Sequence, residues 1–173
     1  MAGQALKSDK AERSATPESH RFTPENRKRL SGPGLRTFLS IADLWELSEN
    51  ERLAILGFPS RSTYHNWRQK ARRHEDITLD LDQLTRISAV LGIHQALMVL
   101  FDSEREGLEW LRLPHLSMAF NGQRPLDWIT SGAQDSILHV RRFLDGARGG
   151  LYMAPNRIDI GFEPYKDSDL VFT

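Results

Sequence analysis

Apolar residues recur at intervals of three and four through the middle of the chain, which is the spacing of one face of an α-helix. Phe38, Ile41, Ala42 and Trp45 show this spacing first. Strict alternation of apolar and polar residues, the pattern of a strand, is rare up to residue 150. The chain is therefore expected to be all-α. The predicted helices cover residues 37–47, 48–57, 62–74, 81–92, 93–101, 103–110, 125–132 and 134–145.

Polar side chains mark where several of these helices begin. Ser48 is followed three residues later by Glu51, the capping-box pattern in which each side chain bonds the other residue's free amide. Pro125 suits the first turn of a short helix, where its missing amide hydrogen is not needed. Single polar residues are expected to cap three other helices. These are Ser60 or Ser62, then Asp80, then Ser103.

Glycines mark where helices are expected to end. Gly57 begins the turn that leads to the helix over 62–74. Gly92 is expected to close one helix and to separate it from the strongly apolar helix that follows. Gly132 and Gly146 are expected to end the last two helices.

The two ends of the chain differ from its helical middle. Residues 1–34 carry many charges and few apolar side chains and close on Ser-Gly-Pro-Gly, so we expect a mobile arm. Residues 151–173 contain two prolines and an alternating IDIGF stretch, so we expect an extended tail. Between them we expect one helical domain over 35–102 and a smaller one over 103–150.

Charge and cysteine content indicate the cellular compartment in which the protein is expected. The 173 residues include 23 basic and 23 acidic side chains and no cysteine. The whole chain therefore exerts no net attraction on nucleic acid or on a membrane surface, and it has no disulfide framework. No apolar run reaches the roughly 20 residues of a transmembrane helix, and the first residues lack a secretion signal. We expect a cytoplasmic protein without membrane contact.

Motifs that would indicate catalysis or metal binding are missing from the sequence. The six histidines form no H-E-x-x-H pattern, and no cysteine completes a zinc site. No G-x-S-x-G motif is present, and the glycines near residue 150 follow a helix instead of a strand. We therefore expect no enzymatic activity, no metal and no cofactor.

One concentrated basic element stands out in the otherwise neutral chain. Residues 57–74 contain five Lys or Arg side chains and no acid, within a predicted helix, turn and helix. That layout is typical of a helix-turn-helix, whose second helix enters the major groove of DNA. The side chains expected to contact DNA are Arg61, His65, Arg68 and Arg72. Tyr64 and Trp67 are expected to pack on the preceding helices. A solvated basic face and a docking site for an acidic protein are the alternatives.

Residues 101–150 carry a series of motifs in a fixed order. The motifs are Gly107-Leu108, Trp110-Leu111, Pro114, Asn121-Gly122, Pro125-Leu126-Asp127, Gly132 and a last helix ending at Gly146. In this order they resemble the toxin-binding domain of the Xre/MbcA/ParS antitoxins. The predicted helix-turn-helix before them is also similar to the arrangement in that family.

The resemblance implies an antitoxin that neutralises a RES-domain toxin, an enzyme that consumes NAD or transfers ADP-ribose from it. It also implies a homodimer within a heteromeric complex, and an antitoxin C-terminal segment that enters the active site of the toxin. Residues 158–173 suit such a cleft because they combine apolar anchors with a net charge of −3. Residues expected to contact the toxin are Trp128, Arg142, Ile160, Phe162, Glu163, Tyr165, Lys166, Asp167 and Asp169.

Two alternatives stay open beside this interpretation. The hydrophobic residues Leu126 and Ile129, and Trp128 between them, can simply fill the core around the last two helices. The protein as a whole can be a transcription regulator without a toxin partner, whose C-terminal part only dimerises. The antitoxin interpretation predicts a stable complex with another protein, with or without binding to operator DNA.

Overall fold

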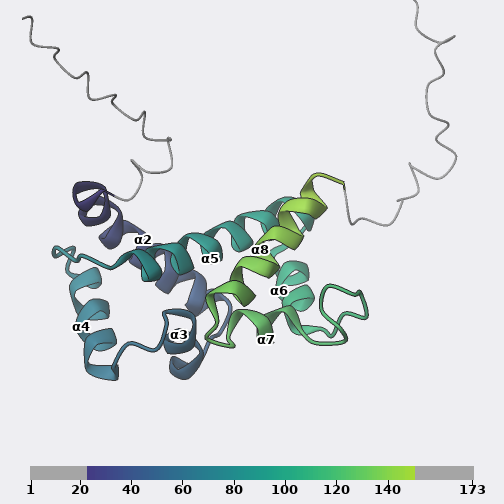
Figure 1. Ribbon diagram of the computed structural model, residues 1–173, viewed down its shortest axis with the longest axis horizontal. Helices are drawn as coiled ribbons and strands as arrows, with labels where there is room; N and C mark the ends of the chain where they lie inside the picture. Colours follow the sequence, from purple (N-terminus) through teal and green to yellow (C-terminus); the bar gives the residue numbers. More distant parts are fainter. Residues whose placement is uncertain (1–22, 151–173) are drawn as a thin grey trace, which may run out of the picture.

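The computed structural model describes residues 23–150, and these residues fold into seven helices and no strand (Figure 1). The predicted all-α fold is confirmed for this part of the chain. The helices are α2 (Pro24–Leu44), α3 (Glu49–Ile55), α4 (Arg61–Arg72), α5 (Leu81–Leu100), α6 (Glu104–Arg112), α7 (Pro125–Ile129) and α8 (Gln134–Arg148).

Helix α5 runs through the centre of the molecule and packs against both α2 and α8 (Figure 1). One continuous core surrounds it, and the largest fully buried side chains come from both halves of the chain. They include Phe38, Trp45, Tyr64, Ile93, Phe120 and Ile129. Leu126 and Ile129 belong to this core, so the core interpretation of these two residues is confirmed.

Several predicted helix starts agree with the structure. Ser48 and Glu51 form the complete capping box at the start of α3, and Ser60 caps α4. Asp80 and Ser103 cap α5 and α6 through the backbone amides three residues later. These signals act within one turn of helix, so the sequence alone specifies them.

Helix α2 begins at Pro24, which corrects the prediction that the first 34 residues form a mobile arm. Ser31 is buried, and its hydroxyl oxygen accepts a hydrogen bond from the backbone amide of Leu79 at 2.9 Å. A Cβ atom on Gly34 would lie 3.6 Å from Ile87 of α5. The Ser-Gly-Pro-Gly stretch is therefore helical because it packs closely on other segments, which overrides its weak helix propensity.

Gly92 lies inside α5, so the prediction of two separate helices over 81–92 and 93–101 is wrong. The guanidinium of Arg141 from α8 covers this glycine, and a Cβ atom would lie 0.9 Å from Arg141 Nη1. Gly92 therefore makes room for a neighbouring side chain and does not end the helix. Gly146 is likewise inside α8, because the buried face of that helix continues through Ala147.

Arg86 of α5 is 8% exposed and bonds three separate segments. Its Nε donates to Asp82 Oδ2 at 2.7 Å, and its Nη1 donates to the carbonyl oxygen of Gly132 at 2.8 Å. The carbonyl oxygen of Ile55 lies 3.5 Å from the same Nη1. Arg86 therefore joins α5 to the end of α3 and to the connection between α7 and α8.

Replacing Arg86 with alanine should lower the free energy of unfolding by about 2–3 kcal/mol, because carbonyl groups inside the protein lose a charged donor. Urea unfolding followed by circular dichroism measures the change. Arg105→Ala removes an exposed arginine of α6 and is the matched control, with an expected change below about 0.5 kcal/mol. Equal losses in the two variants would contradict the role given to Arg86.

Candidate functional site

Helices α3 and α4 are joined by a tight turn, as a helix-turn-helix requires. Gly57 and Phe58 both adopt positive φ, at 79° and 58°. A Cβ atom on Gly57 would lie 3.0 Å from the carboxylate of Asp82 and 3.2 Å from Arg86. Glycine is therefore needed here both for the backbone conformation and for close approach to α5.

Helix α4 has a buried face and an exposed face. Tyr64 and Ala71 are buried and Trp67 is half-buried, which confirms that Tyr64 and Trp67 pack inward. Asn66 and Gln69 are exposed on the opposite face and, being uncharged, were not among the residues predicted to contact DNA. Asn and Gln amides are the usual readers of adenine in the major groove, so residue type was an available signal.

The basic residues at the start of α4 are directed toward α3. Arg61 Nη2 donates a hydrogen bond to Asn50 Oδ1 at 2.8 Å, and its Nη1 forms an ion pair with Glu49. His65 Nε2 lies 3.5 Å from the other carboxylate oxygen of Glu49. Any contact of Arg61 and His65 with DNA stays a prediction, and the ion pair with Glu49 offsets the charge of Arg61.

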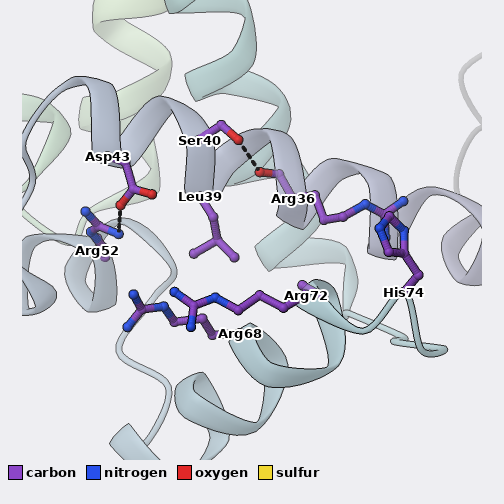
Figure 2. A pocket seen from close by; sticks show the side chains of 9 residues that line it. Arg36, Leu39, Ser40, Asp43, Arg52, Arg68, Arg72 and His74 are labelled. Atoms are coloured by element: carbon purple, nitrogen blue, oxygen red, sulfur yellow. Dashed lines mark hydrogen bonds and ion pairs between the residues drawn. The ribbon is translucent and has the colours of Figure 1, made fainter.

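Arg68 and Arg72, at the other end of α4, line a cavity beneath α2 (Figure 2). Arg36 of α2 and Arg52 of α3 line the same cavity. Burial acts to lower the pKa of the Arg52 guanidinium, but its interactions with Asp43 and Tyr64 together outweigh burial, and the pKa is raised. Of the four predicted DNA-binding residues, Arg61 and His65 thus lie beside Glu49, whereas Arg68 and Arg72 line the cavity.

The C-terminal helices surround a cluster of aromatic rings centred on the fully buried Phe120. Trp128 stacks on His139 with ring centroids 4.8 Å apart, and it meets Phe120 edge to face at 6.4 Å. His139 Nε2 lies 2.8 Å from the carbonyl oxygen of Ala119. Trp128 is therefore half-buried against the core, and contact of its exposed edge with a toxin stays a prediction.

A loop between α6 and α7 presents two apolar side chains to solvent. Leu116 is 94% exposed and Met118 is fully exposed. The loop is fixed on both sides of them, because His115 and Gly122 are joined by a backbone hydrogen bond of 2.9 Å and Phe120 is buried. Because larger exposed apolar patches mark protein contact surfaces, these two neighbouring side chains make the loop a candidate for one.

The first turn of α7 carries a bidentate ion pair. Arg124 Nε donates to Asp127 Oδ2 at 2.9 Å, and Arg124 Nη2 donates to Asp127 Oδ1 at 2.6 Å. These hydrogen bonds lower the pKa of Asp127. The pair closes a turn that has no side-chain cap at Arg124, so it orients the PLDWI segment.

The remaining predicted contact residues divide between α8 and the tail. Arg142 is exposed on α8, on the side away from the buried Ile137, Val140 and Leu144, and its contact with a toxin stays a prediction. The seven predicted tail residues lie outside the described residues. They are Ile160, Phe162, Glu163, Tyr165, Lys166, Asp167 and Asp169.

Residues 23–150 contain no group of three or more His, Asp or Glu side chains that could hold a metal ion. No single helix in this range is long and apolar enough to cross a membrane, whereas α5 and α6 meet that test only as a pair bent by 119°.

Comparison with known proteins gives two family matches and one relative. Residues 24–92 match the antitoxin Xre-like helix-turn-helix domain, and residues 96–150 match the antitoxin Xre/MbcA/ParS C-terminal toxin-binding domain. A Sinorhizobium fredii protein, "Uncharacterized protein y4oB", is 37% identical over 116 residues, which is 67% of this chain and 84% of the relative. No solved structure matches the chain significantly.

Replacing Arg124 with glutamine should move the titration of the Asp127 carboxyl group to higher pH, because the hydrogen bonds that favour its charged form are removed. The stability lost in this variant should be seen at neutral pH. It should vanish as the pH falls through the folded-state pKa, because the carboxyl is then protonated in both proteins. Carboxyl carbon NMR shifts follow the titration. An unchanged midpoint would show that Arg124 does not set the pKa of Asp127.

Proposed function

Because the chain belongs to the Xre/MbcA/ParS family of antitoxins, we propose that it binds and neutralises a toxin of the RES-domain class. Such a toxin consumes NAD or transfers ADP-ribose from it. The protein acts as an inhibitory binding partner and needs no catalytic residues of its own. The observation that carries the proposal is the match of residues 96–150 to a toxin-binding domain, together with the exposed apolar loop within that range.

The loop between α6 and α7 provides the docking surface for the toxin. Leu116 and Met118 bury almost nothing within the described chain, so they contribute little to folding but can bury apolar area against a partner. Arg142 on α8 and the exposed edge of Trp128 lie in the same family domain and add polar and aromatic contacts.

Residues 156–173 then enter the active site of the toxin. Their acidic side chains suit a cleft that binds the phosphates of NAD through basic residues, and Phe162 and Tyr165 supply apolar anchors. The tail follows α8 directly, so docking of the C-terminal helices places the start of the tail against the toxin.

A second activity, binding to operator DNA, is favoured by the exposed face of α4. Asn66 and Gln69 occupy the face of the second helix that a helix-turn-helix presents to base edges. The protein therefore regulates its own operon as a homodimer. Met98 and Val99, exposed on α5, provide apolar area for contact between two copies. The competing interpretation is a regulator that binds DNA and has no toxin partner.

Leu116→Ser and Met118→Ser should each weaken toxin binding by at least about tenfold, because an apolar anchor is lost from the interface. Affinity of the purified antitoxin variants for the toxin measures this. Leu81→Ser changes an exposed leucine at the start of α5 and is the matched control. Equal thermal midpoints establish that the variants are folded. If both loop variants bind the toxin as tightly as the control, the loop is not the docking surface.

Deletion of residues 156–173 should abolish inhibition of toxin activity, because the segment that fills the active site is removed. A truncated protein that still inhibits would refute active-site blocking.

The first experiment is affinity capture of the full-length protein from its own host, with mass spectrometry of the chains that co-purify. A RES-like enzyme is expected with the full chain. Recovery of DNA without any protein partner would support the regulator instead.

A further inference from the structure

A cavity of about 240 Å³ between α2 and α4 is lined mainly by positive charge (Figure 2). Leu39 of α2 and Ala71 of α4 contribute its apolar lining. Four arginines against one aspartate leave an excess of three positive charges, with His74 counted as neutral. The charged and titratable side chains are Arg36, Asp43, Arg52, Arg68, Arg72 and His74.

The single acid of the cavity is already bound. Asp43 Oδ1 lies 2.7 Å from Nη1 of Arg52. Arg52 also donates hydrogen bonds to the carbonyl oxygens of Leu47 and Ala42, at 2.8 and 3.2 Å. This pair therefore joins α2 to α3 and leaves the charge of the other arginines uncompensated.

Within the part of the chain that the structure describes, Arg36, Arg68 and Arg72 form no ion pair. The acids that follow α4 have other partners: Glu75 pairs with Arg73 at 3.7 Å, and Asp76 pairs with Lys28 at 3.0 Å. Three guanidinium groups thus share one concave site without a counter-ion. Such a site focuses a positive potential and attracts an anion.

The arginines approach the cavity from both helices. Figure 2 shows Arg68 and Arg72 extending from α4 toward the end where Arg52 and Asp43 lie. Arg36 extends along α2 toward His74 at the other end. Residues 68 and 72 are one helical turn apart, so their guanidinium groups can bind one anion together.

We propose that this cavity is a binding site for a phosphate group, held by Arg68 and Arg72 of α4 at the end where Arg52 lies. A phosphate carries up to two negative charges and three acceptor oxygens, and guanidinium groups bind it through paired hydrogen bonds. The side chains that line the cavity offer donors in excess and only one carboxylate, which is already paired.

The phosphate can belong to the backbone of DNA or to a small phosphorylated molecule. The shared chemistry defines the site, and the two sources are separated by experiment. This inference does not rest on the proposed toxin binding, because none of these residues lies in the toxin-binding domain. With a small phosphorylated molecule as ligand it goes beyond the proposed operator binding, whereas with a DNA phosphate as ligand it rests on that proposal and names two residues that make the contact.

The test uses the full chain and two probes, inorganic pyrophosphate followed by calorimetry and a labelled random-sequence DNA duplex followed by fluorescence anisotropy. Ionic strength is held constant with chloride, because any basic surface binds DNA more weakly as salt rises. Arg68→Gln and Arg72→Gln each remove one of the two guanidinium groups that are proposed to hold the phosphate. Arg105→Gln removes the same charge from α6, outside the cavity, and is the matched control. Thermal midpoints in phosphate-free buffer establish that each variant is folded.

Both cavity variants are expected to bind at least one probe about tenfold more weakly than the control, the effect of losing a charge-assisted hydrogen bond. Loss for pyrophosphate identifies a small phosphorylated molecule as a ligand, and loss for the duplex alone identifies the DNA backbone. Arg68→Lys should recover only part of the affinity, because lysine keeps the charge but not the paired donors. Absence of binding to both probes, or equal weakening by Arg105→Gln, overturns the proposal.

Discussion

The arrangement of the helix-turn-helix and the C-terminal helices depends on the hydrogen bonds of the buried Arg86 guanidinium. It bonds to α5 itself, to the end of α3 and to the connection between α7 and α8. Phe58, in the turn of the helix-turn-helix, packs against Gly132 beside it, where a Cβ atom would lie 2.3 Å from the phenyl ring. Because glycine keeps this approach open, the turn before α4 rests directly on the C-terminal helices.

Features set within one helical turn could be predicted from the sequence. The capping residues Ser48 and Asp80, Pro125 at the start of α7 and the inward face of α4 all agree with the structure. Each depends on residues three or four positions apart, so no knowledge of the tertiary fold was needed. The family motifs over residues 101–150 also carried the functional class, because their order is visible in the sequence itself.

Features that depend on distant contacts could not be predicted in this way. Residues 24–34 were predicted to be mobile and Gly92 to end a helix, but packing against other segments keeps both helical. The basic residues of α4 could not be told apart in the sequence. In the structure, Arg61 and His65 lie beside Glu49, whereas Arg68 and Arg72 line the cavity beneath α2. In each case the deciding partner lies on a different helix or segment of the chain.

The two family domains meet inside α5, because the first match ends at residue 92 and the second begins at residue 96 of the same helix. A residue inserted between them would turn everything that follows by about 100° and move it by about 1.5 Å along the axis. Arg141 would then no longer face Gly92, nor Gly132 face Phe58. In relatives of this chain, the length of this junction should consequently vary far less than the lengths of the surrounding loops. The number of residues in the junction fixes how the second domain is rotated relative to the first, so it is constrained as strongly as the side chains that pack between them.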